Sequence, residues 1–207
     1  KPHIIFSSST QEERDNLYGK SKREGRKILE QWAKKNNTQF TGLIIPNVFG
    51  PFGNPYYNSV IATFCHQLTH DETPEIQVDS EMKLIYINEL MEVFHKAISR
   101  KLTADSRPLI AYTFPHTAEK KVSEILIQLN KYKSDYYEQG ILPDLKGSFD
   151  LALFNTFRCY MPEKLFPFPY KKHSDDRGDF VEIAKTNSGA VSYTHFRAHE
   201  TKANLVC

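Results

Sequence analysis

The stretch from residue 4 to residue 22, IIFSSSTQEERDNLYGKSK, decides the fold class of this chain. A short apolar run, typical of a buried strand, ends in serines, and a polar link leads to a helical pattern that begins near Tyr18. Side chains at i and i+4 lie on one face of a helix, so Tyr18 and Lys22 are expected side by side, near the serines. A phenol, a cation that stabilises its phenolate and a hydroxyl form a candidate proton-transfer site.

Composition sets broad limits on what the chain can be. Its 207 residues, 40% hydrophobic and 25% charged, suit one substantial core and the start of a second domain. A net charge of +2 gives no argument for nucleic acid or an anionic membrane as partner. Three scattered cysteines (Cys65, Cys159 and Cys207) favour a reducing, cytoplasmic location. The start at Lys1-Pro2-His3 predicts that the chain begins inside a longer protein.

Strand and helix patterns alternate along the chain, which predicts an α/β architecture with a mainly parallel sheet. Strands are expected at 3–8, 41–45, 76–78, 83–87 and 109–114, and helices at 16–35, 60–68, 88–98, 117–132 and 149–165. In the first helix we expect an inner side formed by Gly25, Ile28, Leu29 and Trp32. A Gly/Pro-rich loop, 47–55, follows the strand that ends at Pro46, where α/β folds place ligands.

Two motifs together indicate a family. Tyr18-x-x-x-Lys22 alone would equally suit an amphipathic surface helix, but it lies between a serine-ended strand and the run PNVFGP at 46–51. This combination resembles the active-site half of an extended short-chain dehydrogenase/reductase of the NAD-dependent epimerase/dehydratase family. The resemblance implies a Rossmann-like fold, a tyrosine acid/base, a lysine that also binds the nicotinamide ribose, and a hydroxyl that holds the reacting oxygen.

A narrower resemblance rests on the short serine-to-tyrosine link, on NPYYNSVIATFC at 54–65 and on DDRGDF at 175–180 after a Pro/aromatic linker. Over roughly residues 1–192 the chain resembles bacterial capsular polysaccharide reductase/epimerases of the UDP-N-acetyl-L-fucosamine pathway, which carry a C-terminal cupin. It implies a partial dehydrogenase domain at 1–165, a linker at 166–172 and the start of a truncated cupin at 173–207.

In that family the reductase domain uses NADP(H) to reduce the C4 ketone of a UDP-4-keto-6-deoxy-N-acetyl amino sugar. The cupin, with a divalent metal, epimerises C3. Carried over, Tyr18 would protonate the C4 oxygen, Lys22 would tune it, and Ser9 would hold that oxygen. Ser8 and Thr10 remain alternatives to Ser9.

The same resemblance assigns the second strand end and the loop after it. Asn47 and Asn58 would contact the UDP-sugar, and the backbone near Pro46 and Val48 would lie beside the nicotinamide. Asn58 could equally be only the cap of the helix that follows. We expect a homodimer for the full-length protein, with no nucleic acid or membrane as partner.

Other readings stay open. No Gly-x-x-Gly-x-x-Gly phosphate loop occurs in the chain, so the fragment is expected to be inactive alone. A related 4-epimerase or 4,6-dehydratase is an alternative, and so is a non-catalytic fragment. A dehydratase needs a carboxylate pair beside the hydroxyls, and the only nearby acids, Glu12 and Glu13, are expected to be solvated link residues.

Histidines do not predict a metal site within this chain. His66 and His70 are i,i+4 and could share a metal, but no third ligand is indicated, and a polar, solvent-facing side of the helix explains them better. His195 and His199-Glu200 fall where cupin ligands would begin, yet the sequence departs from the cupin pattern near Ser192. It resembles translated adapter sequence there, so 191–207 is expected to be non-native; a frayed polar terminus is the alternative.

Overall fold

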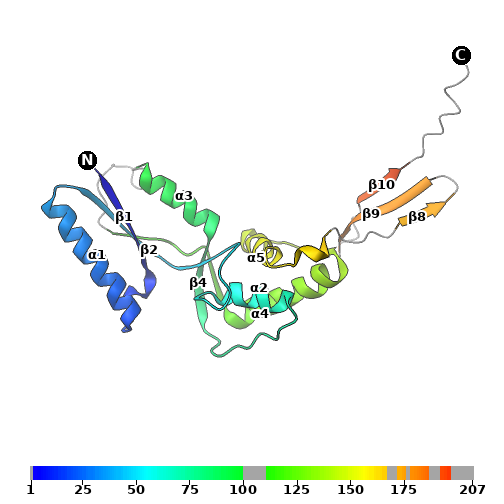
Figure 1. Ribbon diagram of the computed structural model, residues 1–207, viewed down its shortest axis with the longest axis horizontal. Coiled ribbons are helices and arrows are strands. Elements are labelled where there is room, and N and C mark those ends of the chain that lie inside the picture. Colours follow the sequence, from blue (N-terminus) through cyan, green and yellow to red (C-terminus); the bar gives the residue numbers. More distant parts are fainter. Residues whose placement is uncertain (1, 100–110, 167–171, 176–177, 187–191, 197–207) are drawn as a thin grey trace, which may run out of the picture.

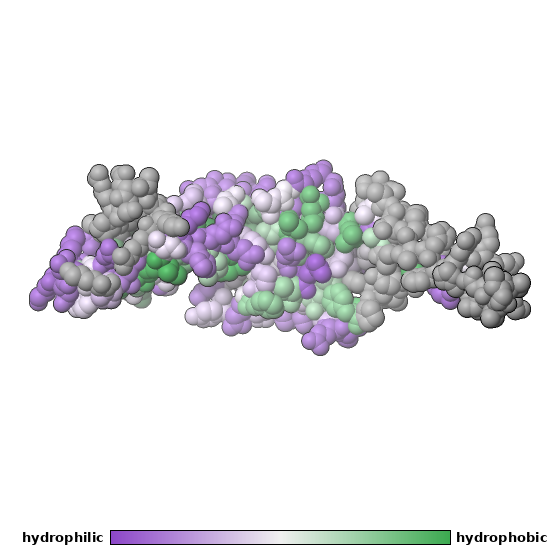
Figure 2. Space-filling view, turned by 90° about the horizontal axis from the view of Figure 1, so that it is seen from above, coloured by the Kyte–Doolittle hydropathy of each residue, from purple (hydrophilic) through white to green (hydrophobic). Residues whose placement is uncertain are grey.

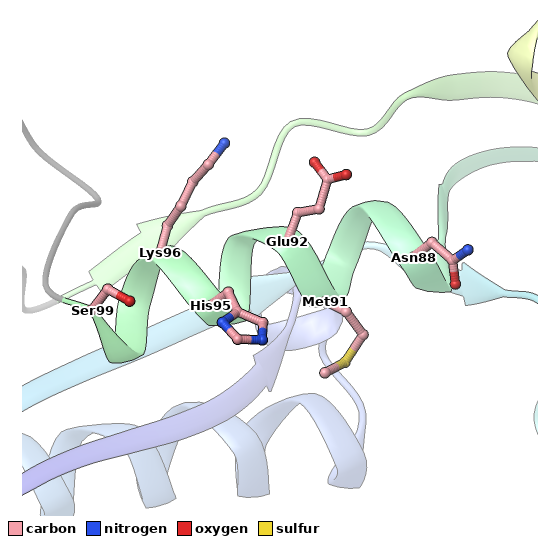
Figure 3. Close-up of a pocket in the computed structure, with 6 residues that line it drawn as sticks. All are labelled: Asn88, Met91, Glu92, His95, Lys96 and Ser99. Carbon is pink, nitrogen blue, oxygen red and sulfur yellow. The ribbon is translucent and has the colours of Figure 1, made fainter.

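The computed structural model describes residues 2–99, 111–166, 172–175, 178–186 and 192–196. In its N-terminal part, a parallel sheet with the order β1-β2-β5 is built from β1 (His3–Ser9), β2 (Gln39–Ile45) and β5 (Ala111–Thr113). Helix α1 (Leu17–Lys35) covers one face of this sheet and α3 (Ile87–Ile98) the other (Figures 1 and 3). A short 3-10 turn, η1 (Thr10–Glu13), links β1 to α1.

A second sheet follows in the middle of the molecule. Its strands are β3 (Asn47–Phe49), β4 (Glu81–Tyr86) and β6 (Ala118–Lys121), with β3 and β4 parallel and β6 antiparallel to β4. Three helices gather beside it: α2 (Val60–Thr69), α4 (Val122–Tyr132), which continues into the π-helical turn η2 (Lys133–Tyr137), and α5 (Ser148–Arg158). Leu129, Leu153 and Phe157 are fully buried between these helices and form the larger core.

The C-terminal part is a small antiparallel unit at the end of the molecule away from the N-terminus (Figure 1). Strand β9 (Gly178–Thr186) pairs antiparallel with β8 (Lys172–Asp175) and β10 (Ser192–Phe196), and parallel with the two-residue β7 (Ile141–Leu142). A short 3-10 turn, η3 (Glu163–Leu165), precedes it. The predicted linker at 166–172 lies mostly outside the described residues.

The α/β architecture is confirmed, but some predicted elements are wrong. Residues 76–78 form no strand, and the loop predicted at 47–55 begins with strand β3. The helix predicted from Thr117 begins at Val122, because residues 118–121 pair with β4 as β6. Helix α4 starts there because the backbone N–H of Lys121 donates to Glu124 and Asp79 accepts from Ser123.

Helix α1 turns a different face to the sheet than predicted. In α1 the buried residues are Gly19 and Ala33, whereas Ile28 and Trp32 are 63% and 48% exposed. The α1 face is set by the link η1, which packs against the start of the helix near Gly19.

The described surface is chemically mixed. Figure 2 shows hydrophilic residues over most of the described part of one face, with smaller hydrophobic areas between them. Among the helices of the described residues, none has the length and apolar character needed to cross a membrane.

Candidate active site

A cavity of about 530 Å³ lies where the carboxyl ends of β1 and β2 meet the first turns of α1 and α2. Its walls also include strands β3 and β4, so both sheets contribute. All seven residues predicted for the site from the sequence line it: Ser9, Tyr18, Lys22, Pro46, Asn47, Val48 and Asn58. The fold therefore brings together a set of residues that is spread over 50 positions of the sequence.

The start of α1 places the phenol and the ammonium. The Asn16 side chain caps the helix by accepting the Gly19 N–H at 2.7 Å. One turn further on, the Lys22 Nζ lies 5.7 Å from the centre of the Tyr18 ring and donates to the Ser7 carbonyl at 3.3 Å. Tyr18 is 51% exposed, so its hydroxyl is accessible to a ligand. The cation thus lies between the phenol and the strand that carries the serines.

The structure distinguishes the three candidate hydroxyls. Ser8 is buried, and its hydroxyl donates to the Glu12 carboxylate. The Ser9 Oγ instead accepts the Gln11 backbone N–H at 3.2 Å, and within the described residues its own proton goes to no acceptor. A hydroxyl has one proton to donate, so Ser9 can still donate to a substrate oxygen while Ser8 cannot. Thr10 does not line the cavity.

Glu12 contradicts the prediction that it is a solvated link residue. It is only 5% exposed, and Arg26 binds its two oxygens through Nε and Nη2 at 2.8–3.1 Å. Burial raises the pKa of Glu12, but hydrogen bonds from Arg26 and Ser8 and the nearby positive charge outweigh burial and lower it overall. Glu13 is exposed, as expected.

The two asparagines hold different positions at the cavity. Asn47 is exposed, and its Nδ2 donates to the Lys83 carbonyl at 3.2 Å. Its Oδ1 can therefore still accept a hydrogen bond from a ligand. Asn58 adopts a left-handed backbone with φ of 54°, while Ser59 is the N-cap of α2 through a bond from the Ala62 N–H. The capping role considered for Asn58 therefore belongs to Ser59, and Asn58 is available to a ligand.

The sequence did not indicate several residues that line the cavity. Met82 and Leu84 come from β4, and only the pairing of β3 with β4 brings them here. Gln11 lines the cavity as a residue of η1, whereas the next residue, Glu12, is buried and does not line it. Gln11 stands two residues after Ser9, and this closeness to the hydroxyl was a signal that could have suggested it.

A second, more open groove of about 540 Å³ runs along α3 (Figure 3). It is lined by five residues of that helix and by its C-cap, Ser99; the five are Asn88, Met91, Glu92, His95 and Lys96. Met91 and His95 point toward the β1 side, whereas Glu92 and Lys96 point away from it (Figure 3). No second described element supplies a side chain to this groove, so we place the candidate site at the strand ends.

Metal ligands do not gather in the described part of the chain. His66 and His70 stack with ring centres 4.0 Å apart, and His70 Nδ1 lies 2.9 Å from the His66 carbonyl. Among the described residues no group of three or more His, Cys, Asp or Glu could hold a metal ion. His199 and Glu200 lie outside the described residues, as does the side chain of His195.

The comparison with known families decides the family. The model of the NAD dependent epimerase/dehydratase family matches residues 2–108. The chain belongs to this family. Members bind a nicotinamide cofactor on a Rossmann-like fold, and the α/β layers and the strand-end cavity described above agree with that fold.

Two individual relatives are more informative than the family as a whole. The chain is 33% identical over 199 residues to the UDP-2-acetamido-2,6-beta-L-arabino-hexul-4-ose reductase of Pseudomonas aeruginosa, covering 95% of this chain and 51% of that protein. The crystal structure of the capsular polysaccharide assembling protein CapF from Staphylococcus aureus matches with a TM-score of 0.77 and 34% identity, over 90% of this chain and 50% of that one. The chain thus spans about half the length of these relatives.

The likeness extends, for the fold alone, to more distant enzymes. UDP-glucose 4-epimerase from Thermotoga maritima matches with a TM-score of 0.59 and 17% identity, over 75% of this chain and 62% of that one. At this identity the match supports the arrangement of strands and helices only.

Proposed function

We propose that the protein to which this chain belongs reduces the C4 ketone of a UDP-4-keto-6-deoxy-N-acetyl amino sugar with NADPH. The observation that carries the proposal is the convergence of Tyr18, Lys22 and the donor-capable Ser9 hydroxyl on one cavity. The name of the Pseudomonas aeruginosa relative, a UDP-hexulose reductase, supports the substrate class.

The residues of the cavity fit both a nicotinamide and a sugar. Tyr18 and Lys22 would hold the nicotinamide ribose, with the backbone at Pro46 and Val48 beside the ring. Asn47, at the start of β3, and Asn58, in the loop before α2, would hold the UDP-sugar. When bound, the cofactor supplies the hydride that adds to C4.

The residues of the chain supply the proton. Ser9 donates a hydrogen bond to the C4 oxygen and orients it toward Tyr18. As C4 gains a hydride, the C4 oxygen takes the Tyr18 hydroxyl proton, so the ketone becomes an alcohol and the tyrosine a phenolate. The Lys22 ammonium stabilises this phenolate, which then regains a proton from solvent.

The test is Tyr18→Phe in the protein encoded by the complete gene, assayed by loss of NADPH absorbance with the UDP-4-keto sugar. Removing a general acid typically costs about 10²- to 10⁴-fold in kcat, and we expect a loss in this range. Tyr57→Phe is the matched control, since Tyr57 is exposed and does not line the cavity. Turnover retained in Tyr18→Phe would remove Tyr18 from the acid role.

We also propose that residues after 172 begin a cupin whose metal site catalyses C3 epimerisation. The antiparallel β8-β9-β10 unit supports a β domain there, as in jelly-roll folds. A homodimer in the cytoplasm completes the proposal, and the exposed Ile28 and Trp32 of α1 supply apolar surface for such a contact. Gel filtration with light scattering of the gene-encoded protein tests the oligomeric state.

A further inference from the structure

A buried carboxylate lies directly behind the candidate site without being part of it. Glu12 is 5% exposed, yet it does not line the cavity that its neighbours Ser8, Ser9 and Gln11 line. Its oxygens accept three hydrogen bonds from Arg26, at 2.8, 2.9 and 3.1 Å, and one from the Ser8 hydroxyl. The Arg26 side chain is itself only 15% exposed.

Helix α1 holds the link η1 at more than one point. Arg23, one turn before Arg26, donates from Nη1 to the Glu12 backbone carbonyl at 3.2 Å. Gly19 lets the link approach the helix so closely that an added Cβ would meet the Gln11 carbonyl oxygen at 2.1 Å. The same turn of chain carries the Gln11 N–H that binds the Ser9 Oγ. The orientation of Ser9 therefore depends on a link that is fixed through Glu12.

We propose that Arg26, Glu12 and Ser8 form a positioning chain, which withdraws the Ser8 hydroxyl from chemistry and fixes the turn that presents Ser9 to the substrate oxygen. The inference rests on the proposed ketone reduction and deepens it. Glu12 is a positioning residue here, because it touches neither the cavity nor the proposed substrate position.

The positioning chain of Arg26, Glu12 and Ser8 also limits the type of reaction. The dehydratase alternative needs a carboxylate pair beside the hydroxyls, one of which takes a proton from carbon within the cavity. Glu12 is the acid nearest the serines, and its four hydrogen bonds and its place behind Ser8 remove it from that role. The residue of this link that does line the cavity, Gln11, is neutral. This arrangement favours reduction over dehydration.

The experiment compares Glu12→Gln with wild type in the protein encoded by the complete gene. Glutamine keeps the size of the side chain but loses the charge that holds Arg26. We expect kcat to fall about 10- to 100-fold, as misplacement of a reacting group by about 1 Å does. The KM for the UDP-sugar should stay within about twofold, because Asn47 and Asn58 are untouched.

A variant of the same helix provides the control. Lys34→Gln removes an exposed ion pair with Glu30, at 2.7 Å, near the other end of α1. We expect kcat and KM unchanged there. A folded Glu12→Gln enzyme with the kcat of wild type would overturn the positioning role, even if its Tm were lower.

A second readout keeps the inference separate from the proposed function. If the wild-type protein does not reduce the UDP-4-keto sugar, the proposed function is wrong. Amide hydrogen exchange then still tests the positioning role of Glu12. The Gln11 amide should exchange at least about tenfold faster in Glu12→Gln than in wild type or Lys34→Gln, since its bond to Ser9 loosens. Equal exchange would overturn the inference.

Should Glu12→Gln not fold, Ser8→Ala tests the same chain with the Glu12–Arg26 pair left intact. It should speed exchange of the Gln11 amide hydrogen. It should also lower kcat several-fold, the size of effect expected from the loss of one hydrogen bond. An unchanged kcat together with unchanged exchange in Ser8→Ala would overturn the inference.

Discussion

Gly19 follows Tyr18 directly, and the link η1 packs on the helix at this point. A Cβ at position 19 would lie 2.1 Å from the Gln11 carbonyl oxygen and 2.9 Å from that of Arg14. Alanine normally stabilises a helix relative to glycine, but here the backbone would have to move. We expect Gly19→Ala to lower the free energy of unfolding by about 1–3 kcal/mol, as overpacking does.

Urea unfolding of the gene-encoded protein measures this change. Gly25→Ala is the matched control on the same helix, because its Cβ would meet the Phe6 ring at an ordinary 3.4 Å. It should be neutral or slightly stabilising, by up to about 1 kcal/mol. Equal stability of Gly19→Ala and wild type would mean that the link does not pack tightly on α1.

The Glu12 carboxyl gives stability a pH dependence of known sign. Burial raises its pKa, but bonds from Arg26 and Ser8 and the charge of Arg26 lower it below the ordinary 4.5. A group with a lower pKa in the folded state stabilises the fold fully above its unfolded pKa, and this stability is lost as pH falls through the folded pKa. We therefore expect the free energy of unfolding to fall below about pH 4.5 more steeply in wild type than in Glu12→Gln.

Unfolding curves between about pH 3 and pH 7 measure this difference. Parallel pH profiles for the two proteins would contradict the prediction.

From the sequence, three hydroxyls remained candidates and Glu12 was expected to be a solvated residue. Neither point follows from residue types, because both depend on the path of η1, in which Gln11 lines the cavity and Glu12 is buried.

At the scale of elements, capping signals and strand patterns were sound guides. The helix predicted at 16–35 is α1 with Asn16 as its cap, and the strand predicted at 41–45 lies within β2. The buried face of α1 was not predictable, because Arg23 and Arg26 face the link while Ile28 and Trp32 stay exposed. The predicted start of α4 was wrong for a related reason. The sequence Ala-Glu-Lys-Lys at 118–121 suits a helix, but its pairing with β4 overrides this local preference.

The loop between β3 and α2 depends on a tether from the end of α5. Phe52, Tyr56 and Asn58 all adopt left-handed backbone conformations, which are costly for residues other than glycine. The Tyr160 hydroxyl donates to the Gly53 carbonyl at 2.6 Å. Burial raises the pKa of Tyr160 to about 12, so this hydroxyl keeps its proton at neutral pH.

We expect Tyr160→Phe to raise the KM for the UDP-sugar about 3- to 10-fold with little change in kcat. The reason is that one lost hydrogen bond, worth about 0.5–1.5 kcal/mol, loosens the loop that carries Asn58. Steady-state kinetics measure it, with exposed Tyr57→Phe as the control. A fall in kcat at unchanged KM would contradict the prediction, because it would mean that the loop affects the chemical step rather than substrate binding.

At the scale of the whole molecule, the cavity lies between two packed units. Leu43 and Ile45 belong to the smaller core under α3, while Ile61 and Leu84 belong to the larger core of α2, α4 and α5. Motifs at strand ends predicted the first wall of the cavity correctly. The wall from β4 follows only from the pairing of distant strands, which no local pattern encodes.

This arrangement leads to a prediction about the cofactor. The cavity holds residues suited to a nicotinamide ribose, but the 207 residues contain no glycine-rich phosphate turn. Dinucleotide affinity depends strongly on a diphosphate bound by backbone N–H groups at a helix N-terminus. We therefore expect these 207 residues, expressed alone, to bind NADPH at least about 100-fold more weakly than the protein encoded by the complete gene, a difference of about 2.7 kcal/mol.

Titration of NADPH fluorescence with each protein measures the two dissociation constants. Tyr18→Phe and Lys22→Met in the gene-encoded protein separate the contributions, because loss of the lysine should weaken cofactor binding whereas loss of the phenol hydroxyl should mainly slow turnover. Equal affinity of the two proteins would contradict the prediction. It would mean that the cavity between the two units, with Lys22 as its cation, is enough to hold the dinucleotide without a phosphate turn.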